Sequence, residues 1–90
     1  MDEETKFKAM ARRNKLLGLW AAEKLGKTGT DADAYAKEVV QADFEEAGDN
    51  DVFRKVRADF DTAGVVLSDT QIRSIMDELL ATAVEQIKNN

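Results

Sequence analysis

The chain has 90 residues, contains no cysteine, histidine or proline, and carries a formal net charge of −5 at pH 7. This length supports one small domain, and the missing residue types exclude disulfide bonds, thiolate metal sites and a histidine general base. No apolar run approaches the roughly 20 residues of a membrane span, and the first residues lack the apolar core of a secretory signal. We therefore expect a single intracellular domain without a metal or other cofactor.

Charge is unevenly distributed along the sequence. Residues 1–27 contain seven Lys or Arg against four Asp or Glu, whereas residues 28–90 contain six against fourteen. Nucleic acid would repel most of such a molecule. The basic first segment therefore favours a polar surface for a protein partner over nucleic-acid binding.

The first predicted helix covers about residues 3–25 and has two different surfaces. Acidic residues at its start complement the helix dipole, and Gly26 supplies a left-handed stop. At about 100° per residue, an apolar face forms that also includes Asn14 and Gly18. The apolar members of this face are Phe7, Met10, Ala11, Leu17, Ala21, Ala22 and Leu25. The basic side chains outside the face belong to Lys8, Arg12, Arg13 and Lys15.

Leu16, Leu19 and Trp20 also fall outside this face, so the second half of the helix is apolar nearly all round. Such a helix either lies centrally in a bundle or offers its second face to a partner. We expect Leu16 and Trp20 to pack within the domain, because small domains rarely leave a tryptophan exposed.

The second predicted helix covers about residues 31–47 and begins after Thr30, a good N-cap. Its apolar stripe ends with Phe44 and contains the carboxylate of Asp43, which must be paired or lie at the edge of the core. Candidate partners for this carboxylate are Arg57, Arg73 and the arginines of the first helix. We expect Asp43, and Asn14 in the first helix, to have structural rather than functional roles.

The third and fourth predicted helices cover about residues 51–63 and 69–88. Gly64 ends the third, a short apolar loop follows, and Ser68 and Gln71 form a capping box that opens the fourth. Four amphipathic helices with short connections predict an all-α, compact four-helix bundle-like domain with antiparallel neighbours. The first and fourth helices are the longest and most apolar, so we expect them to form the core pair.

Two short motifs resemble binding sites but lack essential parts. The GKT run at 26–28 matches the end of a phosphate-binding loop, yet Ala21 stands where a glycine is required and a helix precedes the run. The DFDTAG run at 59–64 resembles the start of a calcium loop, but Thr70 stands where a bidentate carboxylate is required. No pattern combines a nucleophile, a base and an oxyanion site. We therefore expect neither a metal site nor an enzyme.

Three long stretches of the sequence are characteristic of a known family. They are ARRNKLLGLWAAEKLGKTG, DADAYAKEVVQADFEEAGDNDVFRKVRADFDTAG and MDELLATAVEQIK. They resemble the zeta subunit of the alphaproteobacterial F-type ATP synthase, a family formerly described as a domain of unknown function. The resemblance extends from about Phe7 to Lys88.

The resemblance implies a non-catalytic regulatory protein with four helices. It would bind the catalytic head of the synthase, at its alpha, beta and gamma subunits, and inhibit ATP hydrolysis as a ratchet in an alpha–beta interface. It would lie in the cytoplasm, peripheral at the inner membrane through the synthase, without inserting into the membrane. In the family an extended N-terminal arm is inhibitory. Only residues 1–6 precede the matched stretch here, so we expect most of that arm to be absent.

We predict that the partner surface lies on the first helix, from about Glu3 to Leu16, and meets an acidic surface of the synthase. Its expected contact residues are Phe7, Lys8, Arg12, Arg13 and Lys15. An alternative function is a regulatory module that senses a nucleotide or another anion through its basic helix, without inhibitory activity. A purely structural assembly factor is a third hypothesis.

Overall fold

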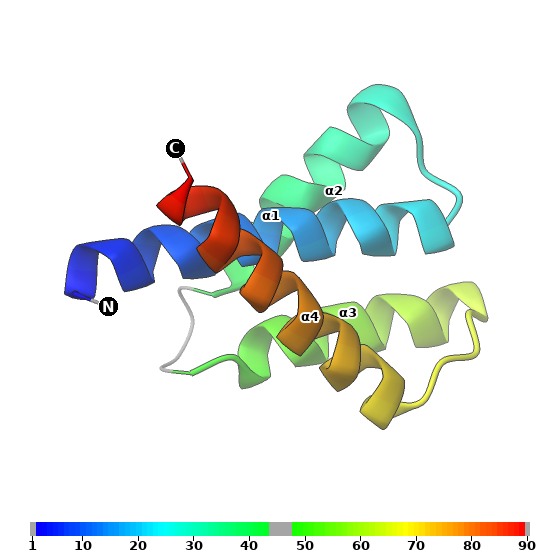
Figure 1. The fold of residues 1–90 in the computed structure, drawn as a ribbon. Coiled ribbons are helices and arrows are strands. Elements are labelled where there is room, and N and C mark those ends of the chain that lie inside the picture. Colours follow the sequence, from blue (N-terminus) through cyan, green and yellow to red (C-terminus); the bar gives the residue numbers. More distant parts are fainter. Residues whose placement is uncertain (1, 44–47, 90) are drawn as a thin grey trace.

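The computed structural model describes residues 2–43 and 48–89, and within these ranges it contains four α-helices and no strand (Figure 1). The helices are α1 (Glu3–Lys24), α2 (Gly29–Ala42), α3 (Asn50–Ala63) and α4 (Asp69–Lys88). The chain reverses its direction at each connection, and α1 lies between α2 and α4 (Figure 1). The predicted all-α, four-helix fold is confirmed.

Side-chain and glycine signals determine both ends of α1. The Asp2 side chain accepts a hydrogen bond from the backbone N–H of Thr5 at 2.7 Å, and this bond lowers the pKa of Asp2. At the other end Gly26 has a φ of 77°, and the N–H of Lys27 donates to the carbonyl of Ala22 at 2.8 Å. This is the hydrogen bond of a left-handed helix stop. The glycine of the GKT run therefore terminates a helix.

α2 begins two residues before its expected start, and the expected cap is wrong. The N-cap is Thr28, whose carbonyl accepts from the N–H of Asp31 at 3.1 Å. Gly29 has a φ of 54°, a conformation open to glycine, so the chain turns directly into the helix and Thr30 lies in its first turn. The helix ends at Ala42 with Asp43 as its C-cap, and residues 44–47 of its expected span, including Phe44, lie outside the described residues.

The connection from α3 to α4 follows the sequence signals. Gly64 ends α3 with a φ of 76°. The Ser68 hydroxyl accepts from the N–H of Gln71 at 3.1 Å, and the Gln71 side chain accepts from the N–H of Ser68 at 2.8 Å. The predicted capping box is therefore confirmed. Val65 and Leu67 pack against the core, whereas Val66 between them is 94% exposed.

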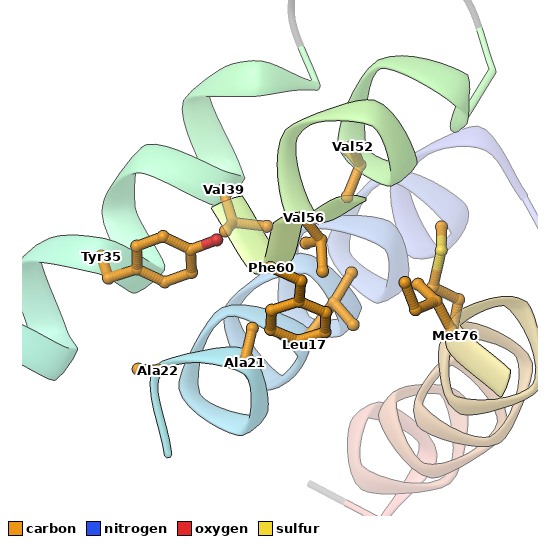
Figure 2. Close-up of a cluster of buried hydrophobic side chains, with 10 residues drawn as sticks. Leu17, Ala21, Ala22, Tyr35, Val39, Val52, Val56, Phe60 and Met76 are labelled. Atoms are coloured by element: carbon orange, nitrogen blue, oxygen red, sulfur yellow. The ribbon is translucent and has the colours of Figure 1, made fainter. Parts of the chain in front are cut away.

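The hydrophobic core gathers side chains from all four helices around α1 (Figure 2). Leu17 of α1 and Phe60 of α3 lie at its centre, and both are fully buried. The ring of Trp20 lies edge-on to Phe60 with centroids 5.7 Å apart, and it packs against the core. The expected packing role of Trp20 is confirmed. The other buried members are Ala21, Ala22, Tyr35, Val39, Val52, Val56, Ile72 and Met76.

A polar network joins α2 to α3 at the edge of the core. The buried Tyr35 donates its hydroxyl hydrogen bond to Asp59 at 2.7 Å, and burial with this carboxylate raises the pKa of Tyr35. The Nζ of Lys55 lies 2.9 Å from the Oδ2 of Asp59 and 2.9 Å from the Oε1 of Glu38. Burial lowers the pKa of Lys55, but its two carboxylate partners outweigh burial and the net shift is upward. Asp59, which begins the calcium-like DFDTAG run, thus serves to hold α2 on α3.

α1 packs against both α2 and α4, and its contact with α2 is the more extensive. The expected α1–α4 pair is therefore present, but α1 and α2 form the more extensive contact. The reason is Gly18, because a Cβ atom at this position would lie only 2.6 Å from the Cα of Ala36. Without a side chain, the backbone of α1 approaches that of α2 very closely.

This close approach predicts a cost for adding one methyl group. We expect Gly18→Ala to lower the free energy of unfolding by about 1–3 kcal/mol, because the clash exceeds the helix-propensity gain of alanine. Urea unfolding followed by circular dichroism measures the change. The exposed Ser74→Ala in α4 is the control, with an expected change below about 0.5 kcal/mol. A Gly18→Ala chain as stable as the wild type would show that α1 and α2 have room for the methyl group.

Candidate functional site

The four basic residues that the sequence placed outside the apolar face of α1 occupy different environments. Lys8 and Lys15 are exposed and Arg12 is half-buried, whereas Arg13 is only 1% exposed. The expectation that Arg13 lies on the solvent-facing basic surface is therefore wrong. Arg13 is buried because α1 is central in the fold and the side of α1 that carries Arg13 lies against Asp49, at the start of α3.

The guanidinium of Arg13 is incompletely satisfied inside the domain. Its Nε donates to the Oδ1 of Asn14 at 2.8 Å, and its Nη1 lies 3.7 Å from the Oδ2 of Asp49. Among the described residues, its buried Nη2 has no hydrogen-bond partner. Burial lowers the pKa of Arg13, and the negative charges of Asp49 and Asp43 oppose this shift. Arg13 is thus a structural cation whose burial carries an uncompensated cost.

Asp49 links Arg13 to α4. Its Oδ1 lies 3.0 Å from the Nη1 of Arg73, and the Nη2 of Arg73 donates to the Oδ1 of Asn50 at 2.7 Å. The Arg73 guanidinium lies 4.2 Å from the ring centroid of Phe53. One carboxylate at the start of α3 therefore lies between an arginine of α1 and an arginine of α4.

Asp43, at the end of α2, lies at the margin of the same polar cluster. Burial raises its pKa, as do the nearby negative charges of Asp51 and Asp49, whereas a hydrogen bond with Asn14 and the charge of Arg13 lower it. The upward contributions dominate. Of the arginines expected to partner Asp43, Arg13 is the one whose charge lowers its pKa within the described part of the chain. Asn14, which the sequence placed on the apolar face of the first helix, forms the hydrogen bond with Asp43.

A shallow groove with a volume of about 910 Å³ lies over the solvent-facing side of α1. Val40 near the end of α2 borders it, as do Gln86 and Ile87 near the end of α4. Its remaining lining residues are Phe7, Lys8, Ala11, Arg12, Lys15, Leu16 and Leu19. Every charged residue in this lining is a cation. We call this surface the basic groove.

The basic groove contains four of the five contact residues expected from the sequence, namely Phe7, Lys8, Arg12 and Lys15. Phe7 is 64% exposed, because the first turns of α1 project beyond the other helices (Figure 1). Its assignment to a face packed within the domain is therefore wrong. Arg12 contacts α4 through a long 3.4 Å hydrogen bond from its Nη1 to the Oε1 of Gln86.

Of the apolar part of the basic groove, the sequence identified Phe7 as a contact residue but not the other members. Leu16 and Leu19 carried a signal, because they fall outside the apolar face of their helix. Val40 and Ile87 carried none, since each belongs to the apolar stripe of another helix and reaches the groove only through the fold.

Within residues 2–43 and 48–89, no group of three or more Asp or Glu side chains could hold a metal ion. None of the helices described combines the length and the apolar character needed to cross a membrane.

The comparison with protein families shows which family the chain belongs to. The model of the ATPase inhibitor subunit zeta family matches residues 1–86. The chain belongs to this family. The match begins at residue 1, earlier than the start near Phe7 expected from the sequence. As a zeta-family member, the chain is an ATPase inhibitor subunit, and this class of protein acts on the ATP synthase.

A solved structure is similar to this chain in sequence and fold. The zeta-family chain is similar to a protein with a solution NMR structure, with 52% sequence identity and a TM-score of 0.82. The similarity covers 93% of this chain and 95% of that one. A search of individually curated proteins found no match.

The ion pair between Arg13 and Asp49 predicts different changes in stability when each partner is replaced. We expect Asp49→Asn to lower the free energy of unfolding by about 1–3 kcal/mol, because it removes the carboxylate that forms an ion pair with the buried Arg13. We expect Arg13→Met to change stability by less than about 1 kcal/mol, because an apolar side chain of similar length avoids the desolvation cost. Urea unfolding at neutral pH measures both. A larger loss for Arg13→Met than for Asp49→Asn would contradict this account.

The raised pKa of Asp43 predicts a pH dependence. The folded chain holds this proton more tightly than the unfolded chain, so this contribution to stability falls as pH rises from 3.8 through the raised pKa. Asp43→Asn removes the titration and retains a side chain that can bond to Asn14. We expect the variant to gain stability relative to the wild type as pH rises from about 4 to 7. Unfolding curves at several pH values would contradict this if the stability of the variant minus that of the wild type stayed constant or decreased as pH rose.

Proposed function

We propose that the chain inhibits ATP hydrolysis by docking the N-terminal part of α1, about Glu3–Leu16, on the catalytic head of the ATP synthase. The single observation that carries this proposal is the sign of the charge in the basic groove. All charged side chains in its lining are positive, although the chain as a whole carries a charge of −5. The partner surface would therefore be acidic.

The cations of the basic groove have little to neutralise them within the chain. Lys8 lies 3.2 Å from Glu4, but both side chains are highly exposed, and such pairs contribute little. Arg12 and Lys15 have no ion-pair partner among the described residues, and the hydrogen bond of Arg12 goes to a neutral amide. These charges are available to attract an acidic partner and to orient its approach.

Inhibition of this kind requires no catalytic residue in the inhibitor. The projecting start of α1 would occupy space at an interface between alpha and beta subunits that changes shape with the bound nucleotide. A segment that binds one state of such an interface better than another opposes their interconversion. The chain would lie in the cytoplasm, at the inner membrane surface only through the synthase.

The proposal predicts the effect of reversing three charges. We expect Lys8→Glu, Arg12→Glu and Lys15→Glu together to raise the concentration needed for half-maximal inhibition by about tenfold or more, because attraction becomes repulsion. The assay measures ATP hydrolysis by the isolated catalytic head of the synthase from the same organism.

A matched control reverses three exposed basic residues outside the basic groove and away from the end of α4, Lys24, Lys27 and Arg54. It changes the net charge by the same amount, and we expect inhibition close to that of the wild type. An equal loss of inhibition in both triple variants would mean that overall charge, and not the basic groove, determines the effect. A wild-type chain that neither binds nor inhibits the catalytic head would refute the proposed function.

A further inference from the structure

The basic groove presents more apolar surface than an electrostatic contact requires. Phe7 is 64% exposed at its open end, and Leu16, Leu19, Val40 and Ile87 are each only half-buried along it. These side chains come from α1, α2 and α4, so the surface exists only in the folded chain. Contiguous exposed apolar side chains beside polar ones are characteristic of a protein contact.

The dimensions of the basic groove match a helical partner. From Phe7 to Leu19 the floor follows α1 for about 18 Å, or three helical turns at 1.5 Å per residue. Lys8, Arg12 and Lys15 follow one another at spacings of four and three residues, so they form one stripe along α1. Acidic residues at the same spacing on a helix lying along α1 would face all three cations.

From this arrangement we infer that the basic groove receives one amphipathic helix of the catalytic head, with acidic residues along one edge. The apolar stripe of that helix would lie against Phe7, Leu19 and Ile87. This inference rests on the proposed function and extends it, because it makes the end of α4 part of the contact. A docking site of this kind obtains its affinity from apolar anchors and its orientation from charge.

Two other occupants fit the observations less well. A phosphate group needs donors that converge on one point, whereas these three cations are distributed along successive turns of one helix. A second copy of the chain could bring Glu85, which lines an adjoining hollow with Arg12, toward the cations. However, each copy carries a net charge of −5, which opposes self-association. Charge therefore favours an acidic segment of the larger partner.

The test replaces one apolar residue in the basic groove, and compares the effect with that of replacing an apolar residue outside it. We expect Ile87→Asp to weaken inhibition of the isolated catalytic head by about tenfold or more, and Ile87→Leu to retain it. Val66→Asp is the matched control, because Val66 is 94% exposed in the α3–α4 connection, and we expect it to inhibit like the wild type. Circular dichroism verifies that each variant is folded.

Photo-crosslinking identifies what occupies the basic groove. A benzoylphenylalanine placed at position 19, and in a second chain at position 87, is irradiated with the catalytic head, and mass spectrometry locates the crosslinked peptide. We expect both positions to reach one helical segment with acidic residues three or four apart. The same group at position 66 should not reach that segment.

The outcomes separate this inference from the proposed function. If the triple charge reversal abolishes inhibition but Ile87→Asp inhibits normally and position 87 gives no crosslink, the helix inference is wrong and the proposed function stands. Crosslinks between two copies of the chain, or to a segment that is not helical or not acidic, would also overturn the inference. If the wild-type chain neither binds nor inhibits, both fail together.

Discussion

The close contact between Gly18 of α1 and Ala36 of α2 determines how the rest of the chain is arranged. Because a Cβ atom at Gly18 would lie 2.6 Å from the Cα of Ala36, α1 sits deep against α2 and becomes the centre of the fold. α4 then crosses its other side, and side chains of α3 complete the core (Figures 1 and 2). The first turns of α1 project beyond the other helices (Figure 1), and the open side of the following turns forms the floor of the basic groove.

The same arrangement divides the basic residues of α1 into two kinds. Arg13 faces the interior, where Asp49 connects it to Arg73 of α4 and its own desolvation is only partly compensated. Lys8, Arg12 and Lys15 face the basic groove and have no comparable partner among the described residues. Adjacent arginines at 12 and 13 therefore have different consequences. The first is available for recognition, whereas the second is buried beside Asp49 in the polar cluster.

Much of the fold could be predicted because its signals are local. The glycine stops, the capping box at Ser68 and the apolar stripes depend on neighbours within a few residues. The burial of Arg13 could not be predicted, because periodicity gives the direction of a side chain but not which directions are covered. The walls of the basic groove were missed for the same reason, since Val40 and Ile87 meet α1 only after folding. The resemblance to the zeta family was correct, but it could not show which cations reach solvent.

The central claim is that the open side of α1, together with the end of α4, is the surface that meets the catalytic head. Cross-saturation between methyl groups, recorded by NMR on the labelled chain bound to unlabelled catalytic head, tests it directly. We predict saturation of the methyl groups of Leu16, Leu19 and Ile87, with Val66 and the buried Ile72 unaffected. Saturation strongest at Val66, with the groove leucines unaffected, would contradict the account.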